Sequence, residues 1–429
     1  MKAYREWDKE SLVAEKDRLE KIWNTYCAQG NTYDMSRGRP CTEQLDLSNG
    51  MLDAVSASTG ALNREGLDCR NYGVVDGMPQ AKEMLADIMG TIPENVIVFG
   101  NSSLNVMYDV VAKNMIHGVC GEEPWCKQEK IKFLCPVPGY DRHFSICEYF
   151  NIEMINIDMT PEGPDMDQVE ALVSSDPAIK GIWVVPKYSN PQGISCSDEV
   201  TRRFARLKPA AKDFRIFWDN AYCIHDLYPD KHDEILDLIE ECKNAGNPDL
   251  VYEFCSTSKI TFPGAGIAGM ATSERNKADI KEALTRQTIG SDKINQLRHV
   301  RFFKDKQHLI SHMMKHAEII RPKFDLFLQR FEDEHLEELG VGKWVRPNGG
   351  YFIAYEAPEG CATAIFNKAK AAGVKMTDAG APFPYHKDPK DSVIRIAPTL
   401  PPMDELKTCV EIFIVCAKLT VVEQCLAAC

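Results

Sequence analysis

The chain has 429 residues, of which 44% are hydrophobic and 26% are charged. These proportions are typical of a globular protein that is large enough to bury a sizeable core. The formal net charge of −13 argues against a nucleic-acid-binding surface, because binding to phosphate backbones needs clustered Lys and Arg.

The first part of the chain predicts a helix, an irregular segment and then a sheet. Leu12, Leu19 and Ile22 recur among charged residues and indicate an amphipathic helix over residues 9–28. Residues 31–71 lack clear periodicity, and an irregular segment of this length is often functional. Charged, helix-like stretches then alternate with apolar runs, which predicts a mostly parallel sheet covered by helices on both faces. The predicted strands are residues 96–99, 131–135, 152–156, 181–185, 215–218 and 251–255.

The last part of the chain predicts a second, smaller unit. Residues 292–330 indicate one long helix or a close pair of helices, which Pro322 would kink or divide. A strand over 351–355, a helix near 361–371 and a strand around Arg395 follow, which is an α+β pattern. We therefore expect an α/β protein that consists of an N-terminal segment packed with the small domain (1–50), a large domain (51–305) and a small C-terminal domain (306–429).

Cysteine usage and the N-terminal residues predict the compartment. The sixteen cysteines are scattered and include no CxxC pair, so free thiols are expected rather than disulfides or a metal site. The first residues are charged and contain no apolar signal-peptide core. No apolar run approaches the ~18 residues of a membrane span. We therefore expect a cytoplasmic protein that has no membrane partner.

A lysine follows the last predicted strand of the large domain. Lys259 comes directly after the apolar run 251–255, so the sheet would fix its backbone, and such an amine can form a Schiff base with an aldehyde cofactor. A solvated surface lysine is the alternative. The neighbouring Ser256, Thr257 and Ser258 favour the first interpretation, because small hydroxyl residues bind phosphate through hydroxyl and backbone N–H groups.

Polar residues also follow two other predicted strands. Asp219 closes the apolar strand 215–218, where an aspartate is commonly only a helix cap or turn residue. Its functional interpretation is an ion pair with the pyridine nitrogen of pyridoxal phosphate, which keeps the ring an electron sink. Tyr222 and Asn190 could donate hydrogen bonds to the ring oxygen of that cofactor, and Pro191 makes the loop around Asn190 a defined turn.

Two further loops carry candidate cofactor contacts. Residues 100–104 follow a strand and open a helix, where backbone N–H groups bind phosphate. N-capping by Ser102 or Ser103 is the alternative, and both roles can hold together. Tyr140 lies after a Pro- and Gly-containing turn and could stack on the pyridine ring, although a lone tyrosine there is more commonly a packing residue.

Arg395 lies in the middle of an otherwise apolar strand. A buried arginine needs an anionic partner. The planar guanidinium matches a substrate α-carboxylate, and an internal Asp or Glu is the alternative partner.

Two other patterns match known motifs by letter only. Residues 264–269 read GxGxxG, but Pro263 precedes them and a strand-like stretch follows, so they predict a flexible turn near Lys259 rather than a dinucleotide site. Ser256 and Lys259 match the Ser-x-x-Lys signature of serine acyl-enzymes, but the other two elements of that family are missing.

Taken together, these residues resemble fold type I pyridoxal-phosphate aminotransferases over nearly the whole chain. Segments 35–40, 45–50 and 288–293 resemble the MocR-like subgroup of stand-alone aspartate aminotransferases. The resemblance implies that Lys259 moves a proton during catalysis, that Tyr72 reaches the phosphate of a neighbouring subunit, and hence that the protein is a homodimer. It assigns cofactor binding to Ser102, Ser103, Tyr140, Asn190, Asp219, Tyr222, Ser256, Ser258, Lys259 and Tyr72, catalysis to Lys259, Asp219 and Tyr222, and substrate binding to Gly38, Asn190 and Arg395.

The resemblance also implies a ping-pong transamination of L-aspartate and 2-oxoglutarate. The alternatives are another amino-acid specificity, a lyase or decarboxylase on the same scaffold, or a ligand-sensing regulator; the acidic chain and its short N-terminal segment argue against the last. One departure is Ile267, because many relatives carry a phosphate-binding arginine there. Lys293, Arg37 and Arg39 are the candidates to supply the missing charge.

Overall fold

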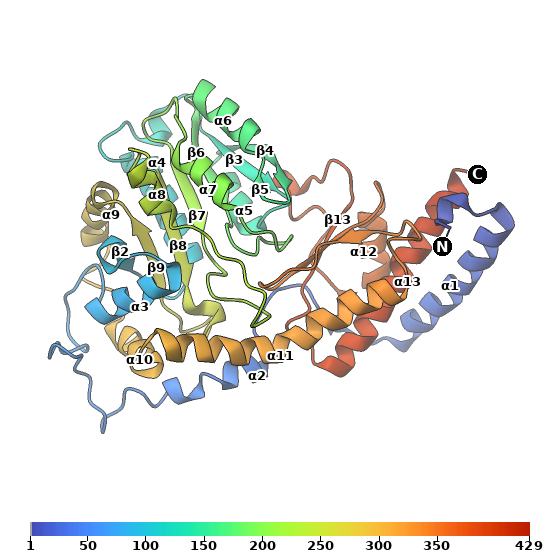
Figure 1. Ribbon diagram of the computed structural model, residues 1–429, viewed down its shortest axis with the longest axis horizontal. Helices are drawn as coiled ribbons and strands as arrows, with labels where there is room; N and C mark the ends of the chain where they lie inside the picture. Colours follow the sequence, from blue (N-terminus) through green and yellow to red (C-terminus); the bar gives the residue numbers. More distant parts are fainter. Residues whose placement is uncertain (1) are drawn as a thin grey trace.

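The computed structural model describes residues 2–429, so that Met1, the first residue of the expected N-terminal segment, lies outside the described residues. An eight-stranded sheet forms one end of the molecule, and a smaller sheet with long helices forms the other (Figure 1). The strand order of the large sheet is β2-β9-β8-β7-β6-β3-β4-β5. Its strands are β2 (Val96–Val98), β3 (Lys132–Val137), β4 (Glu153–Thr160), β5 (Gly163–Pro164), β6 (Ile179–Val184), β7 (Arg215–Asp219), β8 (Val251–Ser256) and β9 (Ala268–Thr272).

The five central strands β8, β7, β6, β3 and β4 run parallel, and so does the edge strand β2, whereas β9, between β2 and β8, and the edge strand β5 run antiparallel to them. The predicted mostly parallel sheet is therefore confirmed. Successive residues of β7 point to opposite faces, so that Ile216 and Trp218 join one hydrophobic core and Phe217 joins the other. Burial on both faces explains why the strands are nearly continuous apolar runs.

Helices cover both faces of the large sheet. The core that contains Trp218 also contains residues of α3, α6, α7, α8 and α10. The core that contains Phe217 includes residues of α4, α5 and α9. These helices are α3 (Pro79–Met89), α4 (Ser103–His117), α5 (Asp141–Tyr149), α6 (Met166–Ser175), α7 (Asp198–Ala205), α8 (Leu238–Asn244), α9 (Glu274–Gln287) and α10 (Lys293–Phe303).

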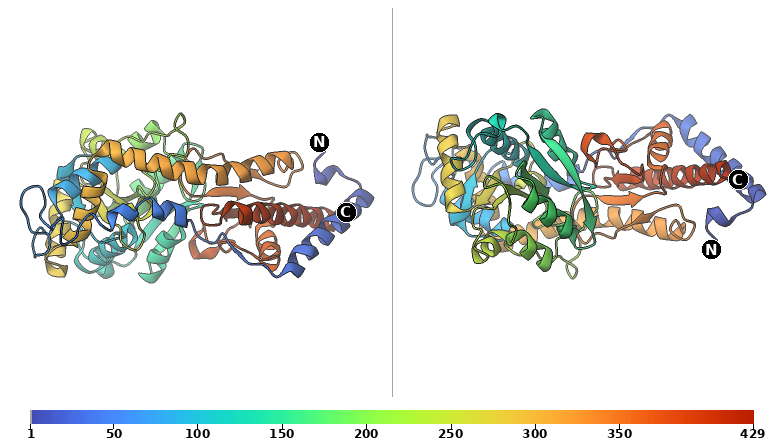
Figure 2. Two further views of the ribbon diagram at one scale, coloured as in Figure 1. Left: turned by 90° about the horizontal axis from the view of Figure 1, so that it is seen from below. Right: turned by 90° about the horizontal axis from the view of Figure 1, so that it is seen from above.

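The smaller unit surrounds an antiparallel sheet with the order β10-β11-β13. The N-terminal helix packs against the C-terminal helix there (Figure 2), and Trp23 Nε1 donates to the carbonyl of Lys368. Strand β1 also pairs with β12. The elements are α1 (Lys9–Gln29), β1 (Tyr33–Asp34), α2 (Thr42–Asp46), α11 (Lys306–Asp333), β10 (Lys343–Trp344), β11 (Ile353–Glu356), α12 (Ala362–Ala371), β12 (Val374–Lys375), β13 (Val393–Ile396) and α13 (Met403–Ala427). These contacts support the packing of the N-terminal segment with the small unit, and we keep the division at residues 50 and 305 as a proposal.

The expected close pair of helices is confirmed, but its predicted division at Pro322 is wrong. The break lies between α10 and α11, where Lys304 has a left-handed backbone (φ 61°) and the side chain of Asp305 accepts from the backbone N–H of His308 as an N-cap. Pro322 lies inside α11, and the helix continues through it. The flanking Ile320 and Phe324 are buried in the core of the small unit, so that tertiary packing outweighs the hydrogen bond lost at the proline.

No helix within residues 2–429 has both the length and the apolar character that crossing a bilayer requires. All sixteen cysteines are free thiols, as the sequence predicts.

Candidate functional site

The candidate site lies at one edge of the large sheet, where the strands end. Asp219 is the last residue of β7, and Lys259 ends the short turn that directly follows β8. Asn190 and Tyr140 lie in the loops after β6 and β3, and Ser102 follows β2. Carboxyl ends of parallel strands meet at the same edge, and ligands bind outside that edge in open α/β sheets.

The amine of Lys259 lies among aromatic rings. Its Nζ is 4.9 Å from the ring centre of Tyr222 and 6.0 Å from that of Tyr351. Burial lowers the pKa of this amine, and the nearby charge of Asp219 opposes the shift. A larger fraction of the amine is therefore unprotonated near neutral pH than for a lysine in water, which suits a nucleophile or a base. The alternative of a fully solvated lysine is wrong.

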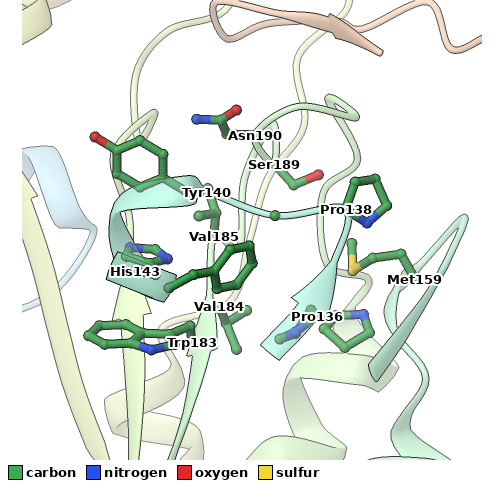
Figure 3. A pocket seen from close by; sticks show the side chains of 13 residues that line it. Pro136, Pro138, Tyr140, His143, Met159, Trp183, Val184, Val185, Ser189 and Asn190 are labelled. Atoms are coloured by element: carbon green, nitrogen blue, oxygen red, sulfur yellow. The ribbon is translucent and has the colours of Figure 1, made fainter. Parts of the chain in front are cut away.

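Asp219 is 2% exposed and has one bound and one free oxygen. Its Oδ2 lies 2.9 Å from Nε2 of His143. Because a carboxylate oxygen only accepts, Nε2 carries the proton and donates it. The imidazole of His143 stacks on the indole of Trp183, with 4.5 Å between ring centres and an 8° angle between planes (Figure 3). The other oxygen, Oδ1, is buried and has no hydrogen-bond partner among the described residues.

A cluster of hydroxyl and backbone groups lies beside Lys259. Ser256 Oγ donates to Ser258 Oγ at 3.0 Å, and Ser258 Oγ donates to the carbonyl of Asn101 at 3.0 Å. Ser102 precedes α4, and its side chain makes no capping hydrogen bond. The hydroxyl of Ser102 and the first N–H groups of α4 are therefore available to an anion.

Gly266 lies next to this cluster of hydroxyl and backbone groups. A Cβ atom on Gly266 would lie 3.0 Å from Thr257 Oγ1 and 3.2 Å from the carbonyl oxygen of Asn101. Because Gly266 has no side chain, its backbone can lie this close to Thr257 and Asn101. The predicted turn over residues 264–269 is confirmed only at its start, at Gly264, since β9 begins at Ala268.

The two tyrosines of the site stay neutral over a wide pH range. Burial, aided by the charges of Asp219 and Asp141, raises the pKa of Tyr140 to about 12. Burial also raises the pKa of Tyr222 well above its usual value. Both phenols can therefore donate hydrogen bonds. In Figure 3, Tyr140 and Asn190 border a cavity that His143 and Trp183 also line.

Arg395 joins the two units of the molecule at this site. It is 6% exposed and lies on β13, opposite Ala354 of β11. Its Nη1 donates to Asp141 Oδ1 at 2.9 Å and to Asn190 Oδ1 at 3.3 Å, and its Nη2 donates to Thr377 Oγ1 at 3.0 Å. The predicted alternative, an internal acidic partner, is therefore present as Asp141.

The predicted substrate residue Gly38 and Arg395 both lie next to the ring of Phe352. The guanidinium carbon of Arg395 is 5.0 Å from the ring centre of Phe352. A Cβ atom on Gly38 would lie 2.5 Å from Cζ of that ring, so no side chain fits at Gly38 without moving Phe352.

Some predicted residues are not brought to the site within one chain. The side chain of Tyr72 is 79% exposed and makes no contact with Lys259 or Asp219. Lys293 donates to the carbonyl of Gly73, and Arg39 pairs with Asp34. Ile267 is buried, and its N–H donates to Thr257 Oγ1.

The sequence analysis missed three residues that contact the predicted ones, namely His143, Asp141 and Thr377, and also Trp183, which stacks on His143. Asp141 and His143 lie in the first turn of α5, directly after Tyr140, so the ends of strands are the signal that could have indicated them. Thr377 lies in an irregular segment and carries no comparable signal.

The geometry agrees with comparisons against known proteins. Residues 8–428 match the family model described as aspartate amino-transferase. The chain is 39% identical over 421 residues to an aspartate aminotransferase of Corynebacterium glutamicum, which covers 98% of this chain and 96% of that protein. A crystal structure of an aspartate transaminase from the same organism superposes with a TM-score of 0.95 at 38% identity and covers 99% of each chain. A Thermus thermophilus α-aminoadipate aminotransferase shares the fold at 17% identity, with a TM-score of 0.72 and coverage of 93% and 94%.

The fold and the site thus define an aminotransferase of fold type I. The chain belongs to the aspartate amino-transferase family.

Proposed function

We propose that this aminotransferase uses pyridoxal 5′-phosphate and exchanges the amino group between L-aspartate and 2-oxoglutarate. The observation that carries the cofactor assignment is the presence, at one edge of the sheet, of both the buried Lys259 amine and a buried oxygen of Asp219 that has no hydrogen-bond partner among the described residues. A buried acceptor without a partner is rare and calls for a donor, which a protonated pyridine nitrogen supplies. The Corynebacterium relative named aspartate aminotransferase supports the choice of substrates.

The residues of the site fit the cofactor. We assign the phosphate to Ser256, Ser258 and the start of α4 at Ser102 and Ser103, the pyridine nitrogen to Asp219, and the ring oxygen to Asn190 and Tyr222. Tyr140 would pack against the ring. The structure of the Thermus relative was solved with N-(5′-phosphopyridoxyl)-L-leucine, which is in keeping with this assignment. Position 267 is occupied by a buried isoleucine and supplies no positive charge to the phosphate. Within one chain Lys293 binds the carbonyl of Gly73 and Arg39 pairs with Asp34, so neither of them balances the phosphate charge there.

When bound, pyridoxal phosphate supplies the electron sink that makes the Cα–H bond of an amino acid acidic. With the cofactor bound, the amine of Lys259 would take the Cα proton and pass it to the cofactor, and its lowered pKa favours the unprotonated, basic form. Asp219 stabilises the proton on the pyridine nitrogen, and His143 holds the Asp219 carboxylate in place. Arg395 binds the α-carboxylate and orients Cα.

We also propose a homodimer with shared sites. The exposed ring of Tyr72 lies in a loop that follows residues 52–62, where Leu52 and Leu62 are likewise more than half exposed. Burial of such apolar side chains against a second copy would be favourable. Light scattering should give the mass of two chains. In a dimer of one Tyr72→Phe chain and one Lys259→Ala chain, shared sites leave one site with both residues intact. An equal mixture of the two variants should then be active, and an inactive mixture would contradict shared sites.

The function is tested with the purified protein and added pyridoxal phosphate. Borohydride reduction followed by mass spectrometry should find the cofactor attached to the peptide that contains Lys259. Oxaloacetate and glutamate should form from L-aspartate and 2-oxoglutarate, and Lys259→Ala should lose at least about 10³-fold in kcat, as expected when a covalent and acid–base group is removed. Release of alanine or ammonia from L-aspartate without a keto acid would instead indicate a decarboxylase or lyase. A screen of other amino donors measures the specificity.

A further inference from the structure

The guanidinium of Arg395 already has partners on each of its edges. On one side Nη1 donates to Asp141 and to Asn190. On the other side Nη2 and Nε donate to Thr377 Oγ1, at 3.0 Å and 3.4 Å. A carboxylate binds a guanidinium through two neighbouring N–H groups. An incoming carboxylate therefore needs at least one of these resident contacts to give way.

The three resident partners differ in how easily they can leave. Thr377 is held by a second hydrogen bond, since its hydroxyl donates to the carbonyl of Ser36 at 2.6 Å. Asn190 is 4% exposed and lies in a turn next to Pro191. The side chain of Asp141 is 25% exposed, and within residues 2–429 its one other ion-pair partner is Arg142, 4.0 Å away and itself 44% exposed. Water and Arg142 can therefore solvate the Asp141 carboxylate after it leaves Arg395.

We propose that Asp141 determines the specificity of the carboxylate site: its carboxylate occupies Arg395 in the free protein and the α-carboxylate of an amino or keto acid displaces it. The inference rests on the proposed role of Arg395. In the free protein the carboxylate keeps a buried cation paired. Only a ligand that replaces the lost charge-assisted hydrogen bond then gains the site, so neutral ligands and weak acceptors are excluded.

The competing interpretation is that Asp141 is a permanent structural partner of Arg395. The two interpretations predict opposite signs. Removing a competitor strengthens the binding of a carboxylate ligand, whereas removing a permanent partner that orients Arg395 weakens it. The ion pair crosses from α5 of the large sheet unit to β13 of the small unit, so thermal unfolding alone does not separate the interpretations.

The test measures the equilibrium binding of succinate, a carboxylate without an amino group, to the cofactor-loaded protein by titration calorimetry. Asp141→Asn should lower the dissociation constant about tenfold, the size of one net charge-assisted hydrogen bond. Glu148→Gln is the matched control, because Glu148 lies exposed on the same helix and makes no contact with Arg395. It removes the same charge and should leave succinate binding unchanged.

Kinetics provide a second readout. Asp141→Asn should lower KM for L-aspartate and leave kcat within about twofold, because the change affects binding of substrate and transition state alike. Asp141→Glu, which keeps the charge, should remain near the original values. Asp141→Ser is a second neutral variant in case Asp141→Asn does not fold, and the same tightening is expected of it.

The variant Arg395→Gln tests the carboxylate site at Arg395 separately from the competition by Asp141. If Arg395→Gln weakens succinate binding at least tenfold while the neutral variants of Asp141 bind it no more tightly than the original protein, the competition is refuted and the role of Arg395 stands. If Arg395→Gln binds succinate as well as the original protein does, the carboxylate site itself is wrong, and the inference falls with it.

Discussion

The free oxygen of Asp219 leads to the sharpest prediction, the effect of Asp219→Asn. This substitution is nearly isosteric and removes the negative charge from a residue that is 2% exposed. Loss of one member of a buried charged pair costs about 3–5 kcal/mol. If that pair forms with the cofactor during the reaction, the loss corresponds to about 10²- to 10⁴-fold in kcat at 1.36 kcal/mol for each factor of ten.

The assay is the initial rate of oxaloacetate formation from L-aspartate and 2-oxoglutarate at saturating cofactor. Asp213→Asn is the matched control. Asp213 is also buried and lies just before β7, at the opposite end from Asp219, where it binds Lys180 and Trp125. This control should lower the free energy of unfolding without changing kcat of the folded protein. If Asp219→Asn keeps more than a tenth of the original kcat, the proposed pairing with the pyridine nitrogen is refuted.

Two further predictions concern the cofactor cluster and a buried acid. Gly266→Ala should raise the dissociation constant of pyridoxal phosphate about tenfold, because the new methyl group would press on Thr257 and Asn101. The measurement is the loss of cofactor absorbance on dialysis. Gly264→Ala is the control and should have no effect, because a Cβ atom there meets nothing within 4 Å. Glu253 is a buried acid whose pKa burial raises from 4.5 to about 8. Between about pH 4.5 and 8 the Glu253 carboxyl keeps its proton in the folded protein but has lost it in the unfolded chain. The free energy of unfolding should therefore fall as the pH rises from about 4.5 to 8. Glu253→Gln should remove this dependence and be more stable than the original at pH 8.5, by up to about 5 kcal/mol in urea unfolding, with little difference at pH 4.5. Equal stability of the two proteins at pH 8.5 would contradict the shift.

The large sheet could be predicted from the sequence because its strands are buried on both faces. A continuous apolar run of four to six residues is then a strong signal, and each of the six predicted strands lies within a few residues of an observed one. The two-residue strands β1, β10 and β12 could not be predicted, since tertiary contacts alone define them. The break at Lys304 was missed because the proline further along is a stronger local signal than a lysine.

The site could be predicted only where it depends on the ends of strands. Asp219 closes an apolar run, Lys259 and Asn190 lie in the loops that follow two others, and parallel strands bring such residues together without further information. The partner of Arg395 could not be identified in the same way. Asp141 is 254 residues away along the chain, and only the packing of the small unit against α5 makes the two side chains neighbours.

The irregular N-terminal segment has a physical reason to be part of the carboxylate site. Thr377 donates to the carbonyl of Ser36, and Thr399 donates to the carbonyl of Arg39, so both ends of the stretch that carries Gly38 are tied to the small unit. Between these ties Gly38 lies close to the tip of the Phe352 ring, and the guanidinium of Arg395 lies over the same ring. A side chain at position 38 would clash with Phe352 and so disturb a ring that Arg395 contacts. Gly38 is thus connected to Arg395 through one aromatic ring, which supports its proposed part in the carboxylate site although it lies far from Lys259 in sequence.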